Sequence, residues 1–425
     1  MSVTPAKRIL LQLTDLHFGP AKAKGHYWNS ESTELQLPRH DRRGLLGSLI
    51  LDLKGQELRP DLVLVTGDLL DRGARAGVKL ARRFLADLAE ELELPPTRIV
   101  IVPGNHDVLR VPDPAQQYKA FDAIRKGLYQ KSRAPFRAGT QPYHRVEVFD
   151  FADPLGLEVV AFNSCEALKP PKQEHGSVGQ AQRDRAAALL QPTEGKGLFR
   201  IALMHHHLAR PKGVVREDFS VMDDDGLVRE WLAKHRFQLA LHGHQHVDCQ
   251  DFVEVGDWRL AISAGGSAGV AAYGRSEWHL RLGYQVIVID TPESGRRIRR
   301  EYDPQSRTWI AAGGDPAETP LQFGKAASVG ATAAPAGGAG ARAGQGPTKA
   351  SLRLLLDEVF RLPEELDAFC IDHFPVVAKS ITGEMGSMKK VNVLLTAGRP
   401  AEILARLRQV KPDKVREHEG LLAYE

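Results

Sequence analysis

The sequence predicts an α/β fold followed by a linker and a small all-α domain. Over residues 1–320, short β-rich apolar runs alternate with longer amphipathic stretches, which is typical of layered α/β proteins. Residues 321–350 are mostly Ala, Gly and small polar residues, a composition that buries too little apolar surface to fold and predicts a flexible linker. Residues 351–425 carry apolar side chains at helical spacing, which predicts the all-α domain.

The elements of the first domain follow from the period of its apolar residues. Runs rich in Val, Ile and Leu predict strands at residues 8–14, 62–66, 99–102, 158–163, 199–204, 239–241, 259–263 and 285–290. Apolar residues at helical spacing predict helices at residues 44–57, 74–91, 114–129, 180–190 and 223–235. The later strands follow one another with less helical sequence between them, so we expect mixed sheets.

The composition is that of an ordinary soluble protein. Of the 425 residues, 42% are hydrophobic and 26% are charged, and the net charge of +4 neither requires nor excludes a nucleic-acid partner. The three cysteines are scattered and form no CxxC pair, which argues against a disulfide framework. No window approaches the roughly 18 to 20 apolar residues of a membrane span, and the first apolar run is too short for a signal peptide. We therefore expect a cytoplasmic protein with no membrane partner.

Metal-binding residue types gather where the predicted strands end. The strand ends read TDLH at residues 14–17, TGD at 66–68, PGNHD at 103–107, MHHH at 204–207 and LHGHQH at 241–246. In α/β sheets, ligands collect in the crevice at the carboxyl ends of the strands. A lone histidine at a strand end is usually structural. Here five successive strand ends each carry a carboxylate, an imidazole or an amide. This series along the chain predicts one shared site.

The residue types predict a centre of two transition-metal ions. Nitrogen and oxygen ligands together suit Mn, Fe or Zn, whereas oxygen ligands alone suit Mg or Ca. Asp68 is the natural bridge, because one carboxylate can join two cations about 3.5–4 Å apart into a clamp for a phosphoryl group. His244 and His246 form an HxH pair that can give one imidazole to each ion. The glycines before Asp68, Asn105 and His244 allow sharp turns over the sheet.

The series DxH, GD, GNHD, H and GHxH resembles that of the calcineurin-like metallophosphoesterase superfamily over residues 9–290, and most closely its branch of cyclic-nucleotide and glycerophosphodiester hydrolases. The resemblance implies a four-layer α/β/β/α sandwich and hydrolysis of a phosphoester by metal-activated water. It implies one ion held by Asp15, His17, Asp68 and His246. It implies a second ion held by Asp68, Asn105, His205 and His244.

The resemblance also implies two catalytic residues. His106 would contact the substrate phosphate and donate a proton to the leaving group, and Asp107 would orient His106 by a hydrogen bond. His205 is taken as the ligand ahead of the two histidines that follow it, because the first histidine after this strand is the ligand in the family. His242 is expected to be structural or to support a ligand.

The substrate stays open at the level of the sequence. The resemblance favours a phosphodiester or a phosphomonoester, with a nuclease as the alternative and a catalytically silent scaffold as the less favoured one. Residues 20–43 form a basic and aromatic insertion that could meet a substrate or be a plain surface loop. Arg110 and His175 could also reach the crevice. The run RRIRR at 296–300 is expected at a solvated strand edge, with nucleic-acid contact as the other interpretation.

The last domain is predicted to be a bundle of four or five helices. Its pattern LDEVF, ELDAFCIDHFP, KVNVLL and PAEIL resembles that of bacterial effector-associated, death-like adaptor domains. Such modules pair with a like domain on another protein. The resemblance implies a protein partner bound through residues 351–408, and an enzyme recruited as an effector of a bacterial conflict system.

Overall fold

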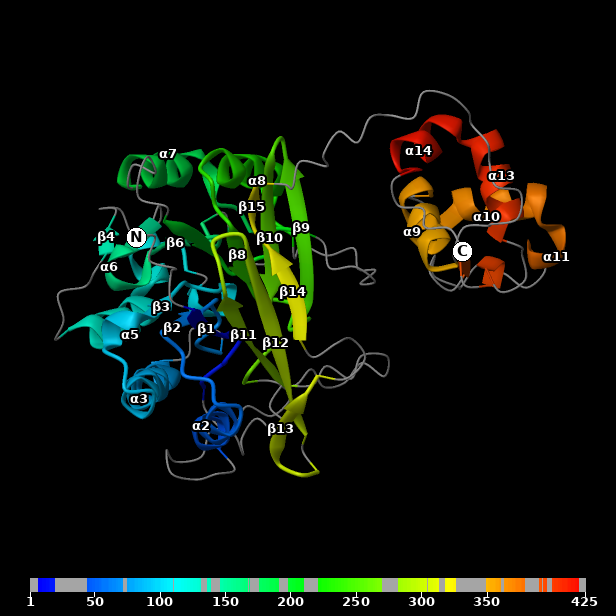
Figure 1. Cartoon of the computed structure of the whole chain (residues 1–425). Coiled ribbons are helices and arrows are strands. Elements are labelled where there is room, and N and C mark those ends of the chain that lie inside the picture. The colour runs from blue at the N-terminus through cyan, green and yellow to red at the C-terminus, as the bar shows by residue number, and fades with distance from the viewer. Residues whose placement is uncertain are drawn as a thin grey trace, which may run out of the picture. The chain divides into compact units, whose positions relative to one another are not determined.

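The computed structural model describes the chain in ranges separated by gaps (Figure 1). The described residues are 7–19, 44–71, 75–109, 111–130, 136–138, 146–166, 168, 176–190, 198–209, 221–269, 282–303, 305–312, 318–325, 349–360, 363–378, 390–391, 393–395 and 400–419. The chain divides into two compact units, Met1–Gly330 and Ala331–Glu425. The predicted insertion at 20–43, Arg110 and His175 lie outside the described residues.

The first sheet is mixed and supplies three of the strand ends that carry the site. Its strands are β1 (Arg8–Leu13), β2 (Leu62–Val65), β3 (Ile99–Ile101), β11 (Gly283–Ile289), β12 (Ser294–Asp303), β13 (Thr308–Ala311) and β14 (Glu318–Gln322). Their order is β13-β12-β11-β1-β2-β3, with β14 paired to β12. β1, β2 and β3 run parallel, so their carboxyl ends meet at one edge of the sheet.

The second sheet supplies the other two strand ends. Its strands are β4 (Phe136–Ala138), β5 (Val146–Phe151), β6 (Leu157–Phe162), β7 (Phe199–Leu203), β8 (Leu239–His242), β9 (Cys249–Val255), β10 (Trp258–Ala264) and β15 (Gly324–Lys325). Their order is β15-β10-β8-β7-β6-β5-β4, with β9 also paired to β10. β6, β7, β8 and β10 run parallel.

Helices cover the outer faces of both sheets, which gives four layers (Figure 1). The helices are α2 (Leu45–Gly55), α3 (Arg75–Glu91) and α5 (Lys119–Tyr129) on one side, and α7 (Gly179–Leu189) and α8 (Asp225–Lys234) on the other, and the short α4 (Pro114–Gln117) precedes α5. Alternate residues of a strand face opposite sides. Along β6, Leu157 and Val159 pack with the first sheet, whereas Val160 and Phe162 pack with α7 and α8. The predicted α/β/β/α sandwich is confirmed.

The predicted elements are present with bounds that differ by one or two residues, apart from one helix. The predicted helix at 114–129 is divided into α4 and α5 at Tyr118, whose side chain is buried and accepts a hydrogen bond from the Asn163 amide at 2.8 Å. The sequence did not predict β5. Its charged Glu147 interrupts the apolar run, yet this side chain is buried because it pairs with Arg125 on α5.

The first unit continues beyond residue 320, where the linker was predicted to follow. β14 pairs with β12, and β15 pairs with β10. Leu321 and Phe323 are buried, and the Phe323 ring meets that of Phe199 edge to face at 4.9 Å between centroids. Burial of these two side chains anchors the segment to the sandwich. The predicted end of the first domain, residue 320, therefore falls inside β14.

The run RRIRR lies within β12 and is largely buried, so the expected solvated edge or nucleic-acid contact is wrong for three of its arginines. Arg297 and Arg299 are 2% and 9% exposed, and both pair with Asp248. Arg300 is 8% exposed and pairs with Asp52 of α2 at 2.6 Å. A charge is tolerated in the interior only when it is paired. These arginines are structural because β12 lies inside the sheet, between β11 and β13.

The second unit is all-α in its described residues, as predicted. Its helices are α9 (Lys349–Val359), α10 (Pro363–His373), α11 (Pro375–Ala378), α13 (Pro400–Val410) and α14 (Pro412–Glu417). Their apolar faces form one core that includes Leu355, Phe369 and Leu407, and Leu394 joins this core from residues 393–395. In the described parts of both units, every helix is too short or too polar to cross a membrane.

Candidate metal centre

The loops after β1, β2, β3, β7 and β8 converge and carry all the predicted metal ligands. In chain order these residues are Asp15, His17, Asp68, Asn105, His205, His244 and His246. Positive φ angles, between 47° and 83°, occur at Asp15, His17, Asp68, His244 and His246. Such a backbone costs about 1–3 kcal/mol at each residue other than glycine. Strain concentrated at these positions indicates that the fold holds the side chains in place against local preference.

Asp15, His17 and His246 form a first cluster. His17 Nε2 lies 3.2 Å from His246 Nε2, and the latter lies 3.4 Å from Asp15 Oδ1. Asp68 Oδ2 is 3.6 Å from His17 Nε2. The side chain of His246 is 17% exposed, whereas those of the other three are nearly fully buried. The cluster therefore reaches solvent at His246.

Asn105, His205 and His244 form a second cluster. Asn105 Oδ1 lies 2.9 Å from His205 Nε2 and 3.1 Å from His244 Nδ1, and these two nitrogens are 3.2 Å apart. His205 Nδ1 contacts the Thr66 carbonyl oxygen at 2.8 Å. A carbonyl oxygen only accepts, so Nδ1 carries a proton. Burial opposes a second proton on the ring, but Asp68 and Asp15 outweigh it and raise the pKa of His205 to about 9, so a cation at Nε2 would take the place of that second proton. That nitrogen can bind a cation.

Asp68 lies between the two clusters. Its Oδ2 is 3.6 Å from His17 Nε2 and 3.4 Å from His205 Nε2, and its Oδ1 accepts the backbone N–H of His106 at 2.8 Å. Burial alone would raise the pKa of Asp68, but His205 and His106 hold this pKa well below its usual range. Asp68 is therefore an anion shared by both clusters, as a bridging ligand must be.

The polar atoms of the site fit cations. Asp15 Oδ1 is buried and meets no hydrogen-bond donor among the described residues, while Oδ2 accepts bonds from the Thr14 hydroxyl and the His244 backbone N–H. Burial lowers the pKa of His17 to about 3, and it holds the pKa of His244 well below its usual value. Neutral imidazoles beside ionised carboxylates are the protonation states that bind metals. The mixed donor set suits Mn, Fe or Zn.

Three glycines let the strand-end loops approach one another. Gly67 has a φ of +94°, a conformation that side-chain-bearing residues rarely adopt. A Cβ on Gly104 would overlap Asp68 Oδ1, and a Cβ on Gly243 would overlap the Thr14 hydroxyl. The predicted role in sharp turns therefore applies to Gly67, whereas close packing is what requires the other two.

His106 lies beside the clusters and faces a carboxylate that the sequence analysis missed. Its ring meets that of His17 edge to face at 4.7 Å between centroids. Its Nδ1 lies 3.6 Å from Asp71 Oδ1, which stands three residues after Asp68 in the sequence TGDLLD. Burial opposes protonation of His106, but Asp68 and Asp71 outweigh it and raise the pKa of the ring. Its side chain is 22% exposed, so the ring is partly accessible to solvent.

Asp107 does not face His106, so the prediction that it orients this ring was wrong. Its buried carboxylate accepts three backbone N–H groups, from Leu69 at 3.2 Å, Leu70 at 2.8 Å and Gly104 at 2.9 Å. Neighbours in the turn Asn105–Asp107 point in different directions. Asp107 joins the loop after β2 to the loop after β3.

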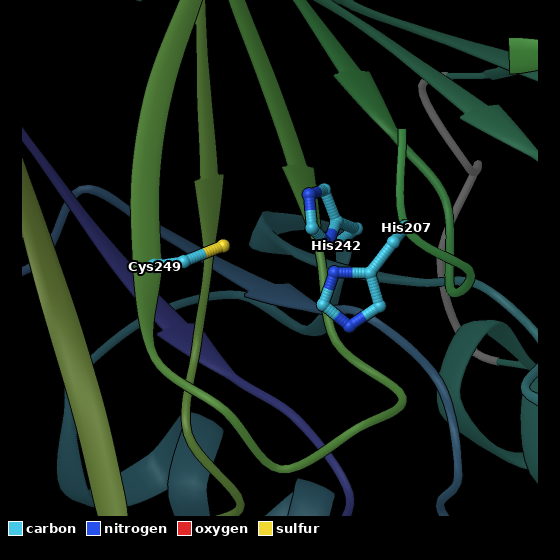
Figure 2. Close-up of side chains that lie close together, drawn as sticks. All are labelled: His207, His242 and Cys249. Carbon is cyan, nitrogen blue, oxygen red and sulfur yellow. The ribbon is translucent and has the colours of Figure 1, made fainter. Parts of the chain in front are cut away.

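The three consecutive histidines after β7 have different surroundings. His205 faces the clusters, as expected of the ligand. His206 Nδ1 contacts the Ser164 hydroxyl at 2.9 Å. His207 packs against His242, with ring centroids 4.5 Å apart (Figure 2). His207 and His242 therefore belong to a separate group of side chains.

Comparison with known proteins places the chain in a family. A model of the calcineurin-like phosphoesterases matches residues 9–248. Several solved structures are similar to this chain. One is a dimetal phosphatase from Danio rerio, which is 10% identical and has a TM-score of 0.44; the match covers 74% of this chain and 99% of that one. Another is a purple acid phosphatase from yellow lupin, with 15% identity over 70% and 52% and a TM-score of 0.42. A third is a putative 5'-nucleotidase from Staphylococcus aureus, with 12% identity over 67% and 51% and a TM-score of 0.37.

None of the curated proteins matches the chain. The family model nevertheless covers the sandwich from β1 to the loop after β8, with every strand end that contributes to the two clusters. The chain belongs to the calcineurin-like phosphoesterase family.

Proposed function

We propose that this chain is a dinuclear metal-dependent phosphoesterase. Its family supports metal-dependent hydrolysis of a phosphoester. The observation that carries the proposal is the position of Asp68, whose Oδ2 lies 3.4–3.6 Å from a histidine of each cluster. One carboxylate between two sets of nitrogen and oxygen atoms is what a two-ion clamp requires.

The ligands divide between two divalent ions. One would be held by Asp15, His17, Asp68 and His246, and the other by Asp68, Asn105, His205 and His244. Such ions would supply Lewis-acid stabilisation of charge on the phosphoryl oxygens and would acidify water near neutral pH. The donor atoms suit Mn, Fe or Zn.

His106 is the proposed proton donor to the leaving group. Asp71 faces its Nδ1, which leaves Nε2 for the leaving oxygen. Asp68 and Asp71 both favour the protonated ring. Asp107 acts indirectly: its carboxylate accepts hydrogen bonds from three backbone N–H groups and so holds the loop that carries His106.

We propose a phosphodiester as the substrate class, with a phosphomonoester as the alternative. The family resemblance of the strand-end motifs supports this class. A nuclease was the alternative from the sequence, and RRIRR was the basic run that could favour it. Arg297, Arg299 and Arg300 of that run are buried in ion pairs, so they offer no basic surface to nucleic acid.

The test is hydrolysis of an aryl phosphodiester and its matching monoester by metal-stripped full-length protein, with Mn, Fe, Zn or Mg added back. We expect metal-dependent turnover that falls at least about 100-fold in Asp68→Asn. Asp257→Asn is the matched control, because that carboxylate is 67% exposed on a distant turn. Turnover that persists in Asp68→Asn, or that needs no metal, overturns the proposal.

We further propose that the second unit recruits the enzyme by binding a protein partner through residues 351–408. An all-α core of its own supports this role. Ile371 is 62% exposed on α10 and is the side chain to test first. In affinity capture with the full chain, Ile371→Asp should lose the partner, whereas Leu227→Asp, changed at a 58% exposed leucine of α8, should retain it. Equal capture by both variants contradicts this surface.

A further inference from the structure

A second group of metal-binding side chains lies beside the dinuclear centre and shares no ligand with it. His207, from the loop after β7, His242, at the end of β8, and Cys249, at the start of β9, point toward one another (Figure 2). One potential ligand atom of each lies within 4.8 Å of those of the other two. This trio is named here the His-His-Cys cluster.

The strand register explains why the cluster forms. Ala264 of β10 pairs with His242 of β8 on one side and with Cys249 of β9 on the other. Residues in register on adjacent strands point to the same face of a sheet. His242 and Cys249 therefore flank Ala264, whose small side chain leaves room between them. His207 approaches from the neighbouring loop and completes the group.

The two imidazoles of the cluster are buried without the partners that such groups require. His207 and His242 are 0% exposed. All four of their ring nitrogens are buried, and in the described part of the chain none makes a hydrogen bond of good geometry, although the Gly243 backbone interacts with His242. A buried polar group that is left without a hydrogen bond destabilises the fold. Two such rings, packed at 4.5 Å beside a thiol, are a costly arrangement unless something binds their nitrogens.

We propose that the His-His-Cys cluster binds a third metal ion, of the zinc type. Two imidazole nitrogens and one thiolate suit a borderline or soft cation, and Zn²⁺ takes nitrogen at about 2.0–2.1 Å and sulfur at about 2.3 Å. Binding releases the Cys249 thiol proton to solvent as the sulfur–metal bond forms. Three protein ligands leave a fourth position for water or another group.

The third ion positions the dinuclear centre. His207 stands two residues after His205, and His242 stands two residues before His244. An ion that joins His207 to His242 therefore ties together the two loops that supply His205 and His244. Cys249 extends this tie to β9, so the site stabilises one side of the centre.

The first test is metal stoichiometry and the absorption spectrum of the full-length protein. One sample of metal-stripped protein is titrated with Zn²⁺ to measure the stoichiometry. A separate sample is titrated with Co²⁺, whose thiolate complexes show a near-ultraviolet charge-transfer band. We expect three equivalents and this band in the wild type, and two equivalents and no band in Cys249→Ser. Cys370→Ala, which changes a thiol of the second unit, should keep both. Saturation at two equivalents, or a band that survives in Cys249→Ser, overturns the proposal.

Two further measurements keep the result interpretable. Asp68→Asn should lose metal from the dinuclear centre and keep the thiolate band, so failure of the third site is distinguishable from failure of the proposed enzyme. Alkylation of Cys249 in the wild type, followed by mass spectrometry, needs no variant to fold. We expect protection of this thiol only after the third equivalent of Zn²⁺ is added. Alkylation that is unchanged at three equivalents contradicts the site.

Discussion

Asp71 Oδ1 lies 3.6 Å from His106 Nδ1, and this contact joins a carboxylate of the loop after β2 to an imidazole of the loop after β3. The two side chains are 16% and 22% exposed, so water screens the contact only in part. A carboxylate at one ring nitrogen fixes the orientation of the ring and favours its cation. Asp71 is therefore a positioning residue for the proposed proton donor.

Asp71→Asn should lower kcat for an aryl phosphoester about 10- to 100-fold, with a smaller change in KM, because the ring loses its orienting charge. The check is a double-mutant cycle with His106→Gln. Residues that act as a unit are not additive, so Asp71→Asn should cost little once His106 is replaced. An equal loss in both backgrounds would show that Asp71 acts elsewhere.

Asp107→Asn should act on stability. An amide oxygen cannot replace a carboxylate that accepts three backbone N–H groups, and its NH₂ group would face one of these donors. We expect the free energy of unfolding to fall by about 2–4 kcal/mol, measured by urea denaturation of metal-stripped protein. Asp71→Asn is the control and should change this free energy by less than about 1 kcal/mol. If Asp71→Asn lowered the free energy of unfolding more than Asp107→Asn does, Asp107 would not be the residue that joins the two loops.

The contrast between these two aspartates shows what sequence can predict about this site. Each proposed ligand follows a strand directly or within a few residues, so strand periodicity and residue type located the strand ends, whereas the family resemblance selected His205 and divided the ligands between two ions. The resemblance implied a carboxylate that orients His106, and Asp107, the next residue in the chain, was assigned this role. Adjacent side chains of a tight turn diverge, whereas the fold brings Asp71 to His106 from another loop.

Buried charges and strand register account for the other differences. Glu147 and the β12 arginines belong to buried strands only because a partner from another element pairs with each charge. A single sequence identifies the charge but not its partner. The His-His-Cys cluster escaped prediction for a similar reason, since His242 and Cys249 meet only through their common register with Ala264.

Arg300→Met should destabilise the fold by about 3–5 kcal/mol, because it leaves the buried Asp52 carboxylate without its cation. Asp52 and Arg300 each have side chains that are 9% exposed. The double variant Asp52→Leu with Arg300→Met should recover part of the loss, since no lone charge remains. Urea denaturation measures both, and equal stability of the single variant and the wild type would contradict a structural role for the pair.

Gly104→Ala should lower kcat/KM about 100-fold, because its Cβ would displace the Asp68 carboxylate. Gly226→Ala is the control. It lies in α8 with nothing within 4 Å of the added Cβ, so we expect unchanged kcat/KM. Metal content of both variants is measured beside the rate. Full activity and metal content in Gly104→Ala would contradict the close approach of the two loops.

His235 makes stability depend on pH. Burial lowers the pKa of His235, and Arg200 and Lys234 lower it further. Its ring packs on Trp231 at 4.3 Å between centroids. The unfolded state, with the ordinary pKa of 6.5, therefore binds more protons than the folded state at mildly acidic pH. Stability associated with this group is complete above the unfolded pKa and is lost as pH falls below it.

We therefore expect the thermal midpoint of metal-stripped protein to fall between about pH 7.5 and pH 5.5, and to fall less in His235→Gln. His17 and His242, whose pKa values burial lowers to about 3, still contribute in the variant with the same sign. His205 and Asp107, whose pKa values are raised to about 9 and about 7, contribute with the opposite sign, so the effect of His235 is the difference between the two slopes. Lys234→Gln is a matched surface control that keeps the imidazole and should keep most of the slope. An unchanged slope in His235→Gln would mean that this ring titrates alike in the folded and unfolded states.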